Sequence, residues 1–398
     1  MALYKEQEVR QLVDNIAAFL EEKIENDHAV ISGLGALYFL LNYHKGNNDR
    51  TEQFAEILNH GISSYEISEN KLETYAEGFL SYGTLIKLLA RNQLYGFDNY
   101  DEIITLINDI AIEHGMIHIR DNNFDFLHGT TGIIHYLLLH TEGSDQIEAF
   151  ITHFIDSLEG NAIPCLAGLC WRDEYIARRE NRQVVNMGLA HGMFSILSVL
   201  TTIAGSHLKV NKEKVNKLLK GALTFILGVI NKNPDSASRF PNFYYLDNPV
   251  DDPSRLGWCY GDLTNGYKLL QVGKQLKDEE LIGASLTVIN HTIARKTPAQ
   301  TSVEDACLCH GAAGIMHLYN KLYMATGAVQ YHNAALFWLD SVIDAYKPKH
   351  PYAGFVNTGN DSLKNMGLLN GIAGIGLALD SYLTGDSSWD HILMLNQL

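Results

Sequence analysis

Several features that define common protein classes are scarce in this chain of 398 residues. Basic residues are outnumbered, 30 Lys and Arg against 46 Asp and Glu, which gives a formal net charge of −16. Nucleic-acid-binding proteins need a basic face that displaces phosphate counterions, so this balance argues against that class. Cysteine is also rare: five residues, an odd number, do not fit a disulfide framework and favour a reducing compartment. The first thirty residues lack the apolar run of a signal peptide, so we expect a cytoplasmic protein.

Long, purely apolar runs are missing as well. The segment 183–208 contains no Asp, Glu, Lys or Arg, but Asn, His, Ser, Thr and Gly interrupt it. A bilayer would leave these polar groups poorly satisfied, so the segment is better explained as a loop followed by a helix buried on all sides. Proline is scarce too, and four of the eight prolines lie in 231–257, which indicates a helical protein with a long loop there. Few strand patterns are present, and no strand-rich insertion is evident.

What the sequence does contain is a repeat. Seven blocks share a glycine, two further residues, a small residue and then an apolar helical run. The glycines are Gly33, Gly78, Gly129, Gly192, Gly261, Gly311 and Gly371. Before each block, apolar residues recur at the i, i+3, i+4, i+7 spacing of an amphipathic helix. These stripes cover about 7–24, 51–58, 99–113, 146–158, 212–230, 278–295 and 331–346.

Seven alternations of amphipathic and apolar helices predict a specific architecture. Helices that are apolar all round must be enclosed, whereas amphipathic helices can face water. We therefore expect an all-α protein, an α/α toroid (barrel) of seven inner and seven outer helices, formed as a single domain by residues 1–398. An open solenoid fits the repeat equally well, but it would expose its apolar helices on the concave face. The small residue one turn after each glycine predicts close approach between neighbouring helix starts.

The residues just before the block glycines are aligned by the repeat, so they should project from one end of the inner ring. One position upstream, three of the seven residues are histidines: His128, His191 and His310. Two positions upstream, Cys259 and Cys309 occupy adjacent repeats. Two thiolates and the imidazole of His310, with a fourth position open, form the ligand pattern of a catalytic zinc.

The spacing of these residues is equally compatible with a purely structural role. Cysteine is often a small buried hydrophobe, and a histidine beside an apolar helix is often a hydrogen-bonded core residue. Cys307 is an alternative ligand, whereas Cys165 and Cys170 are expected in a loop, as inert thiols.

Three further residues are candidates for proton transfer and charge stabilisation. His191 has the chemistry of a general acid or base, and the Asp125 carboxylate, four residues before Gly129, is suited to orient it or raise its pKa. Arg255, four residues before Cys259, is a candidate for stabilising a developing oxyanion. The ordinary alternatives are a hydrogen-bonded core histidine and a loop cation.

Together these residues resemble the signatures of a known family. The matching segments are Gly188-Leu-Ala-His191-Gly192, Trp258-Cys259-Tyr260-Gly261, Cys309-His310-Gly311 and Leu369-Asn370-Gly371-Ile-Ala-Gly374. They resemble the motifs of the lanthionine synthetase C-like (LanC) cyclases, in the same order along the chain. The resemblance covers about 125–379 through its motifs and nearly the whole chain through the repeat.

The resemblance implies both a metal and a reaction. The metal would be one Zn²⁺, held by Cys259, Cys309 and His310, with a substrate thiol as the fourth ligand. The reaction would be an intramolecular Michael-type addition of cysteine thiols to dehydroalanine or dehydrobutyrine, which forms the (methyl)lanthionine thioether rings of a lanthipeptide (lantibiotic). Catalytic and substrate-binding roles would carry over by residue: His191, Asp125 and Arg255 would be catalytic, and Trp258 and Tyr260 would contact the substrate.

The same resemblance implies partners. The substrate would be a dehydrated precursor peptide, and a dehydratase and an ABC exporter would hold this cytoplasmic enzyme peripherally at the membrane. Two alternatives remain: a prenyltransferase-like α/α barrel, whose zinc ligands are typically Asp, Cys and His, and a cyclase-like scaffold that binds zinc and thiols such as glutathione without forming thioethers. The net charge of −16 is compatible with a cationic peptide substrate.

Overall fold

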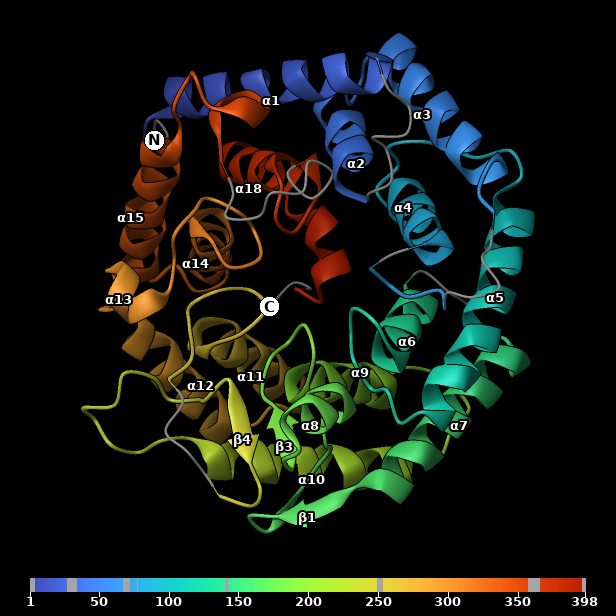
Figure 1. The fold of residues 1–398 in the computed structure, drawn as a ribbon, viewed down its shortest axis with the longest axis vertical. Helices are drawn as coiled ribbons and strands as arrows, with labels where there is room; N and C mark the ends of the chain where they lie inside the picture. Colours follow the sequence, from blue (N-terminus) through green and yellow to red (C-terminus); the bar gives the residue numbers. More distant parts are fainter. Residues whose placement is uncertain are drawn as a thin grey trace.

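The alternating helices form two concentric rings in the computed structural model (Figure 1), which describes residues 4–26, 34–66, 72–76, 78–139, 143–248, 253–356 and 366–395. The outer helices are α1 (Glu6–Asn26), α3 (Asn48–Ser63), α5 (Tyr100–Arg120), α7 (Asp145–Asn161), α10 (Lys212–Val229), α12 (Glu279–Thr292) and α15 (Val329–Ala345). The inner helices are α2 (Leu34–Tyr43), α4 (Phe79–Arg91), α6 (Thr130–Leu138), α9 (Met193–Gly205), α11 (Asp262–Leu276), α14 (Ala312–Thr326) and α18 (Ile372–Thr384). The predicted α/α toroid is confirmed.

Burial follows the two kinds of helix that the sequence predicts. In α10, one stripe is buried, including Val215, Leu218 and Leu219, and the opposite face is exposed to solvent. In α9, every residue from Met193 to Thr201 is buried, because neighbouring helices cover it on all sides. The middle of the segment 183–208, residues 184–201, is therefore part of the protein core, whereas its two ends reach the surface. No helix in the described ranges is long and apolar enough to cross a membrane.

The block glycines mark the starts of inner helices. Gly33 lies outside the described residues, and each of the other six immediately precedes its helix. The preceding loop folds back over the helix start, so that a Cβ on Gly192 would lie 2.0 Å from the Asn186 carbonyl oxygen. One turn later, a Cβ on Gly314 would lie 1.9 Å from the Leu308 carbonyl oxygen. The tightest constraint on these small residues is thus their own loop, rather than the neighbouring helix start that we expected.

A chain of backbone hydrogen bonds joins these loops around the ring. In each link, the amide two positions before a block glycine donates to the carbonyl of the equivalent residue in the next repeat, with N–O distances of 2.8–3.3 Å. The links are Ala76 to Leu127, Leu127 to Ala190, Ala190 to Cys259, Cys259 to Cys309, and Cys309 to Leu369. Positions that are equivalent in the repeat are therefore physical neighbours at one end of the toroid.

The first and last repeats meet, which distinguishes a toroid from an open solenoid. Helix α18 packs against both α1 and α2, and Figure 1 shows these helices side by side. Backbone approach is close at this junction, since a Cβ on Gly35 would lie 2.5 Å from the amide nitrogen of Leu368.

A small insertion between α7 and α9 contains strands, contrary to the prediction of loops there. Strands β1 (Ile163–Cys165) and β2 (Gly168–Cys170) form an antiparallel hairpin, so Cys165 and Cys170 are strand residues rather than loop residues. After α8 (Glu174–Glu180), β3 (Val184–Asn186) pairs antiparallel with β4 (Phe243–Tyr245). Three further short helical segments are α13 (Pro298–Thr301), α16 (Pro351–Gly354) and η2 (Ser388–Leu393).

Candidate functional site

Two thiols and an imidazole meet where two neighbouring inner helices begin. Cys259 precedes α11, and Cys309 and His310 precede α14. One ligand atom from each of the three lies within 4.8 Å of the other two. The Cys259 amide donates to the Cys309 carbonyl at 3.3 Å, so the backbone itself holds the two thiols side by side. Two sulfurs and one imidazole nitrogen are ligands that zinc prefers.

The two thiols influence each other's ionisation. A hydrogen bond from Cys309 holds the pKa of Cys259 well below its ordinary value, with His310 and Arg255 acting in the same direction against the effect of burial. The pKa of Cys309 is raised well above its ordinary value, first by its hydrogen bond to Cys259 and then by burial. The pair therefore gives up one proton readily and keeps the second. A divalent cation is what allows both neighbouring thiols to ionise, so the donor set fits a metal.

A second group shares the imidazole of His310. Ligand atoms of Asp305, Cys307 and His310 also lie within 4.8 Å of one another. Burial raises the pKa of Cys307 far above its ordinary range, and one carboxylate oxygen of Asp305 already accepts the Cys307 amide at 2.9 Å. The Cys259, Cys309 and His310 set offers two sulfurs and a nitrogen, whereas the other set includes a carboxylate that already accepts a backbone amide, so the former is the better zinc candidate within the described part of the chain.

His191 and Asp125 form a hydrogen-bonded pair across two neighbouring repeats. His191 Nδ1 lies 2.7 Å from Asp125 Oδ2, and the other oxygen, Oδ1, accepts the backbone amide of His128 at 2.8 Å. Burial by itself would lower the pKa of His191, but the hydrogen bond and charge of Asp125 outweigh it, and the pKa is raised. Charge on Cys259 contributes in the same direction, which indicates that the imidazole lies close to the thiol site.

A pocket of about 1060 Å³ opens beside this pair, and its walls include His191, Asp125 and Tyr260. The lining also includes Tyr175 and Arg179 from the insertion and Phe243 from β4. The ring of Tyr260 lies 6.1 Å from that of His191 and 5.9 Å from that of Phe243, measured between centroids. Tyr260 therefore lies in a pocket wall, directly beside Cys259 in the chain, and its contact with substrate stays a prediction.

Asn186, which was not among the predicted site residues, connects the insertion to the pocket. Its Nδ2 donates to the hydroxyl of Tyr260 and to the carboxylate of Asp173, each at 2.9 Å, and its Oδ1 accepts the amide of Gly188. The repeat contains a signal for it, because Asn186 lies six positions before a block glycine. The same offset holds a polar residue in five of the other six repeats: Asp27, Asn123, Arg255, Asp305 and Asn365.

Arg255 and Trp258 lie in different surroundings, although both belong to the loop before α11. The charge of Arg255 lowers the pKa of Cys259 and of Cys309, so the guanidinium lies near the thiols. Trp258 is only 1% exposed, and its indole N–H donates to the carbonyl of Leu393 at 2.9 Å. Trp258 thus lies in the core, and its contact with substrate stays a prediction. Like Arg255 and the three ligand residues, it is not among the residues that line the pocket of about 1060 Å³.

Comparison with known proteins gives this architecture a family. No curated protein sequence matches the chain. Among solved structures, nisin cyclase is similar over 97% of this chain and 97% of its own, with a TM-score of 0.74 and 16% sequence identity, which shows a shared fold. A family model described as "Lanthionine synthetase C-like protein" matches residues 2–394. With nearly every residue covered by that model and the toroid shared with nisin cyclase, the chain belongs to the lanthionine synthetase C-like family.

Proposed function

We propose that this protein is a zinc-dependent lanthipeptide cyclase, which closes thioether rings in a dehydrated precursor peptide. The observation that carries the proposal is the arrangement at one end of the toroid. There the Cys259, Cys309 and His310 group lies close to the His191–Asp125 pair, which lines a pocket of about 1060 Å³. This is the combination that thiol addition needs: a place to ionise a thiol and a proton donor near it.

Cys259, Cys309 and His310 would hold the zinc ion, since their ligand atoms already converge within 4.8 Å. Zinc, when bound, supplies the positive charge that keeps a substrate cysteine thiol deprotonated near neutral pH. The proposed roles of the other residues follow from their positions around that thiol.

In the proposed reaction, the substrate sulfur forms a bond to the β-carbon of dehydroalanine or dehydrobutyrine, and the C=C electron pair moves onto the adjacent carbonyl oxygen. The guanidinium of Arg255 stabilises the resulting enolate charge. Asp125 holds Nδ1 of His191 and favours the imidazolium, so Nε2 delivers the proton to the α-carbon. The proton lost by the substrate thiol balances the one added at carbon, and Tyr260 positions the peptide within the pocket.

The proposal extends to the cellular setting. A dehydratase would supply the dehydrated serine and threonine residues, and an ABC exporter would remove the product, with this chain as a cytoplasmic member of the complex at the membrane. The second candidate, a scaffold that binds zinc and thiols such as glutathione without forming thioethers, uses the same metal ligands, so only an activity assay separates the two.

The test is ring formation in a dehydrated precursor, followed by alkylation of free thiols and mass spectrometry. We expect the zinc-loaded wild type to protect the substrate cysteines, and Cys309→Ala or the metal-free protein to leave them open to alkylation while the helical circular dichroism is retained. Cys170→Ala is the matched control, because Cys170 is buried in the β1–β2 hairpin, outside the ligand group. This variant should form rings as the wild type does.

Two results would contradict the proposal. Full protection of the substrate by metal-free protein would remove zinc from the reaction. A zinc-loaded wild type that binds dehydrated precursor or glutathione and forms no ring would identify the scaffold instead.

A further inference from the structure

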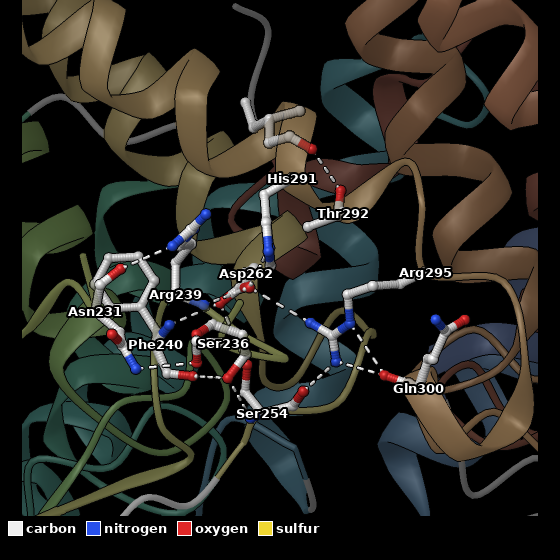
Figure 2. Close-up of polar contacts among 12 residues, drawn as sticks. Asn231, Ser236, Arg239, Phe240, Ser254, Asp262, His291, Thr292, Arg295 and Gln300 are labelled. Atoms are coloured by element: carbon white, nitrogen blue, oxygen red, sulfur yellow. Dashed lines mark hydrogen bonds and ion pairs between the residues drawn. The ribbon is translucent and has the colours of Figure 1, made fainter. Parts of the chain in front are cut away.

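One buried carboxylate fastens the long loop that precedes Cys259. Asp262, the first residue of α11, is 0% exposed. Its two oxygens accept the backbone amides of Arg239 and Phe240, each at 2.8 Å, and Oδ1 also accepts the hydroxyl of Ser254 at 3.3 Å. Figure 2 shows these groups converging on Asp262, although Phe240 and Ser254 are well separated in the sequence.

Arg295 completes this cluster from the segment after α12. Its Nη1 lies 3.4 Å from Asp262 Oδ2, and its Nη2 donates to the carbonyl oxygens of Ser254 and of Gln300, the latter at 2.7 Å. Arg295 is only 6% exposed, and burying its charge is unfavourable unless an acid and further acceptors accompany it. The charges of Asp262 and Arg295 therefore compensate each other, and both side chains form hydrogen bonds with Ser254 (Figure 2).

The residue that both side chains bind is Ser254, which directly precedes Arg255 in the chain. The Ser254 amide donates to Ser238 Oγ at 2.9 Å, its hydroxyl donates to Asp262, and its carbonyl accepts from Arg295. On the other side of Arg255, the Leu256 amide donates to the Thr301 carbonyl at 3.0 Å. The backbone on both sides of Arg255 is thus fixed, although Asp262 touches neither the thiols nor the pocket.

We infer that Asp262 is a positioning residue for the reaction. With Arg295, it holds Ser254 in place and so fixes the backbone from which the Arg255 side chain extends, four residues before Cys259. The inference rests on the proposed function for its chemical consequence. Its geometric content, a rigid backbone at 254–256 that depends on the Asp262 carboxylate, stands on the hydrogen bonds alone.

The variant Asp262→Asn tests the inference in zinc-loaded protein. The amide keeps the shape of the side chain, but it replaces one acceptor by a donor among two backbone N–H groups and a guanidinium. We expect kcat for ring formation to fall about a hundredfold, as displaced catalytic groups do, with KM and zinc content unchanged. Glu21→Gln is the matched control: the Glu21 carboxylate is also paired with a cation, Arg50, at 3.2 Å, but it lies in α1, outside the Asp262 cluster, so kcat should be retained.

A double-mutant cycle separates positioning from a general structural role. If Asp262 acts through Arg255, then Asp262→Asn should slow the wild type but not the Arg255→Ala variant, as measured in single-turnover assays. Hydrogen exchange supplies a readout that does not depend on activity: the amides at 254–256 should exchange faster in Asp262→Asn and at the wild-type rate in Glu21→Gln.

The outcomes distinguish this inference from the proposed function. A wild type that forms no ring contradicts the function, and the exchange measurement then decides on the positioning role. Equal slowing of wild type and Arg255→Ala, an unchanged kcat in Asp262→Asn beside an active wild type, or unchanged exchange at 254–256 would each overturn the inference.

Discussion

At the scale of single residues, the protonation of His191 depends on a balance of two influences. Burial favours the neutral imidazole, and the carboxylate of Asp125, 2.7 Å away, favours the imidazolium more strongly. The raised pKa suits a group that donates a proton near neutral pH. Because the raised pKa of His191 depends mainly on Asp125, the direction in which the pKa moves when Asp125 is replaced can be predicted.

Asp125→Asn should lower the pKa of His191, since burial is then opposed by a weaker partner. The alkaline limb of the rate profile for ring formation should move to lower pH, because the proton donor is lost sooner as the pH rises. Stability should follow the same linkage. A pKa raised on folding contributes stability that is fully present below the unfolded value, about 6.5, and is lost as pH rises through the folded pKa. The free energy of unfolding of Asp125→Asn should therefore fall further below that of the wild type at pH 6 than at pH 9.

An NMR titration of the His191 ring, together with denaturant unfolding at the two pH values, checks this prediction. Asp121→Asn is the control, because Asp121 lines the same pocket but makes no bond to His191 in the described structure, and it should leave the pKa in place. A His191 pKa that is unchanged or higher in Asp125→Asn would show that the carboxylate does not determine the imidazole's protonation.

Sequence reasoning reached some of these residues and missed others for physical reasons. Cys259 and Cys309 share an offset in adjacent repeats, and the backbone hydrogen bond between them turns that offset into contact. Trp258 adjoins the same motif, but its side chain points to Leu393, 135 residues away, and no local pattern encodes that direction. Asn186 had the repeat offset of a site residue, but it lies in a strand that the sequence did not indicate.

At the scale of elements, the helices follow from periodicity, whereas the strands of the insertion do not. The β1–β2 turn uses Leu166 and Ala167 at φ values of 48° and 61°, where Asn and Gly are the usual signal, so the hairpin has no recognisable turn sequence. Strands β3 and β4 are three residues each and pair across a long stretch of chain. Patterns this short cannot be distinguished from loops.

The C-terminal segment is an element whose role comes entirely from tertiary contacts. It turns into the middle of the ring (Figure 1). Four consecutive carbonyls, of residues 391–394, accept hydrogen bonds from inward-facing side chains: His135, Tyr75, Trp258 and Lys268, in that order. Asp390, 1% exposed, pairs with Lys321 at 2.6 Å and His317 at 2.8 Å. The segment therefore fastens side chains from several repeats to one another.

Asp390→Asn should destabilise the fold strongly. Removing one member of a buried ion pair leaves the other charge uncompensated, at a cost of roughly 3–5 kcal/mol. Asp340→Asn offers the comparison, since Asp340 pairs with Lys5 at the surface at 2.9 Å and such pairs are worth about 0–1 kcal/mol. Denaturant unfolding of both variants measures the difference, and equal losses would mean that the segment 388–395 is not a structural support.

At the scale of the whole molecule, the decisive property is closure. Each inner helix is enclosed because it has a neighbouring helix pair on both sides. For the first and last pairs, the packing of α18 against α1 and α2 provides these neighbours. The repeat predicts the number of helix pairs, but closure depends on how much each pair rotates relative to the next, which no single repeat reveals. Gly35 lies at this junction, where a Cβ would come within 2.5 Å of the backbone nitrogen of Leu368.

Gly35→Ala should therefore weaken the junction between the first and last repeats. The added Cβ would lie 2.5 Å from the Leu368 nitrogen and 2.7 Å from its Cα, so the backbone must separate, at a cost of about 1–3 kcal/mol for such overpacking. Gly283→Ala in α12 is the matched change without a neighbour within 4 Å, and there the better helix propensity of alanine should stabilise the protein by up to about 1 kcal/mol. Denaturant unfolding should thus shift in opposite directions for the two variants, with faster hydrogen exchange in α1 and α18 for Gly35→Ala alone. A Gly35→Ala protein as stable as Gly283→Ala would show that the ring does not depend on this contact for its closure.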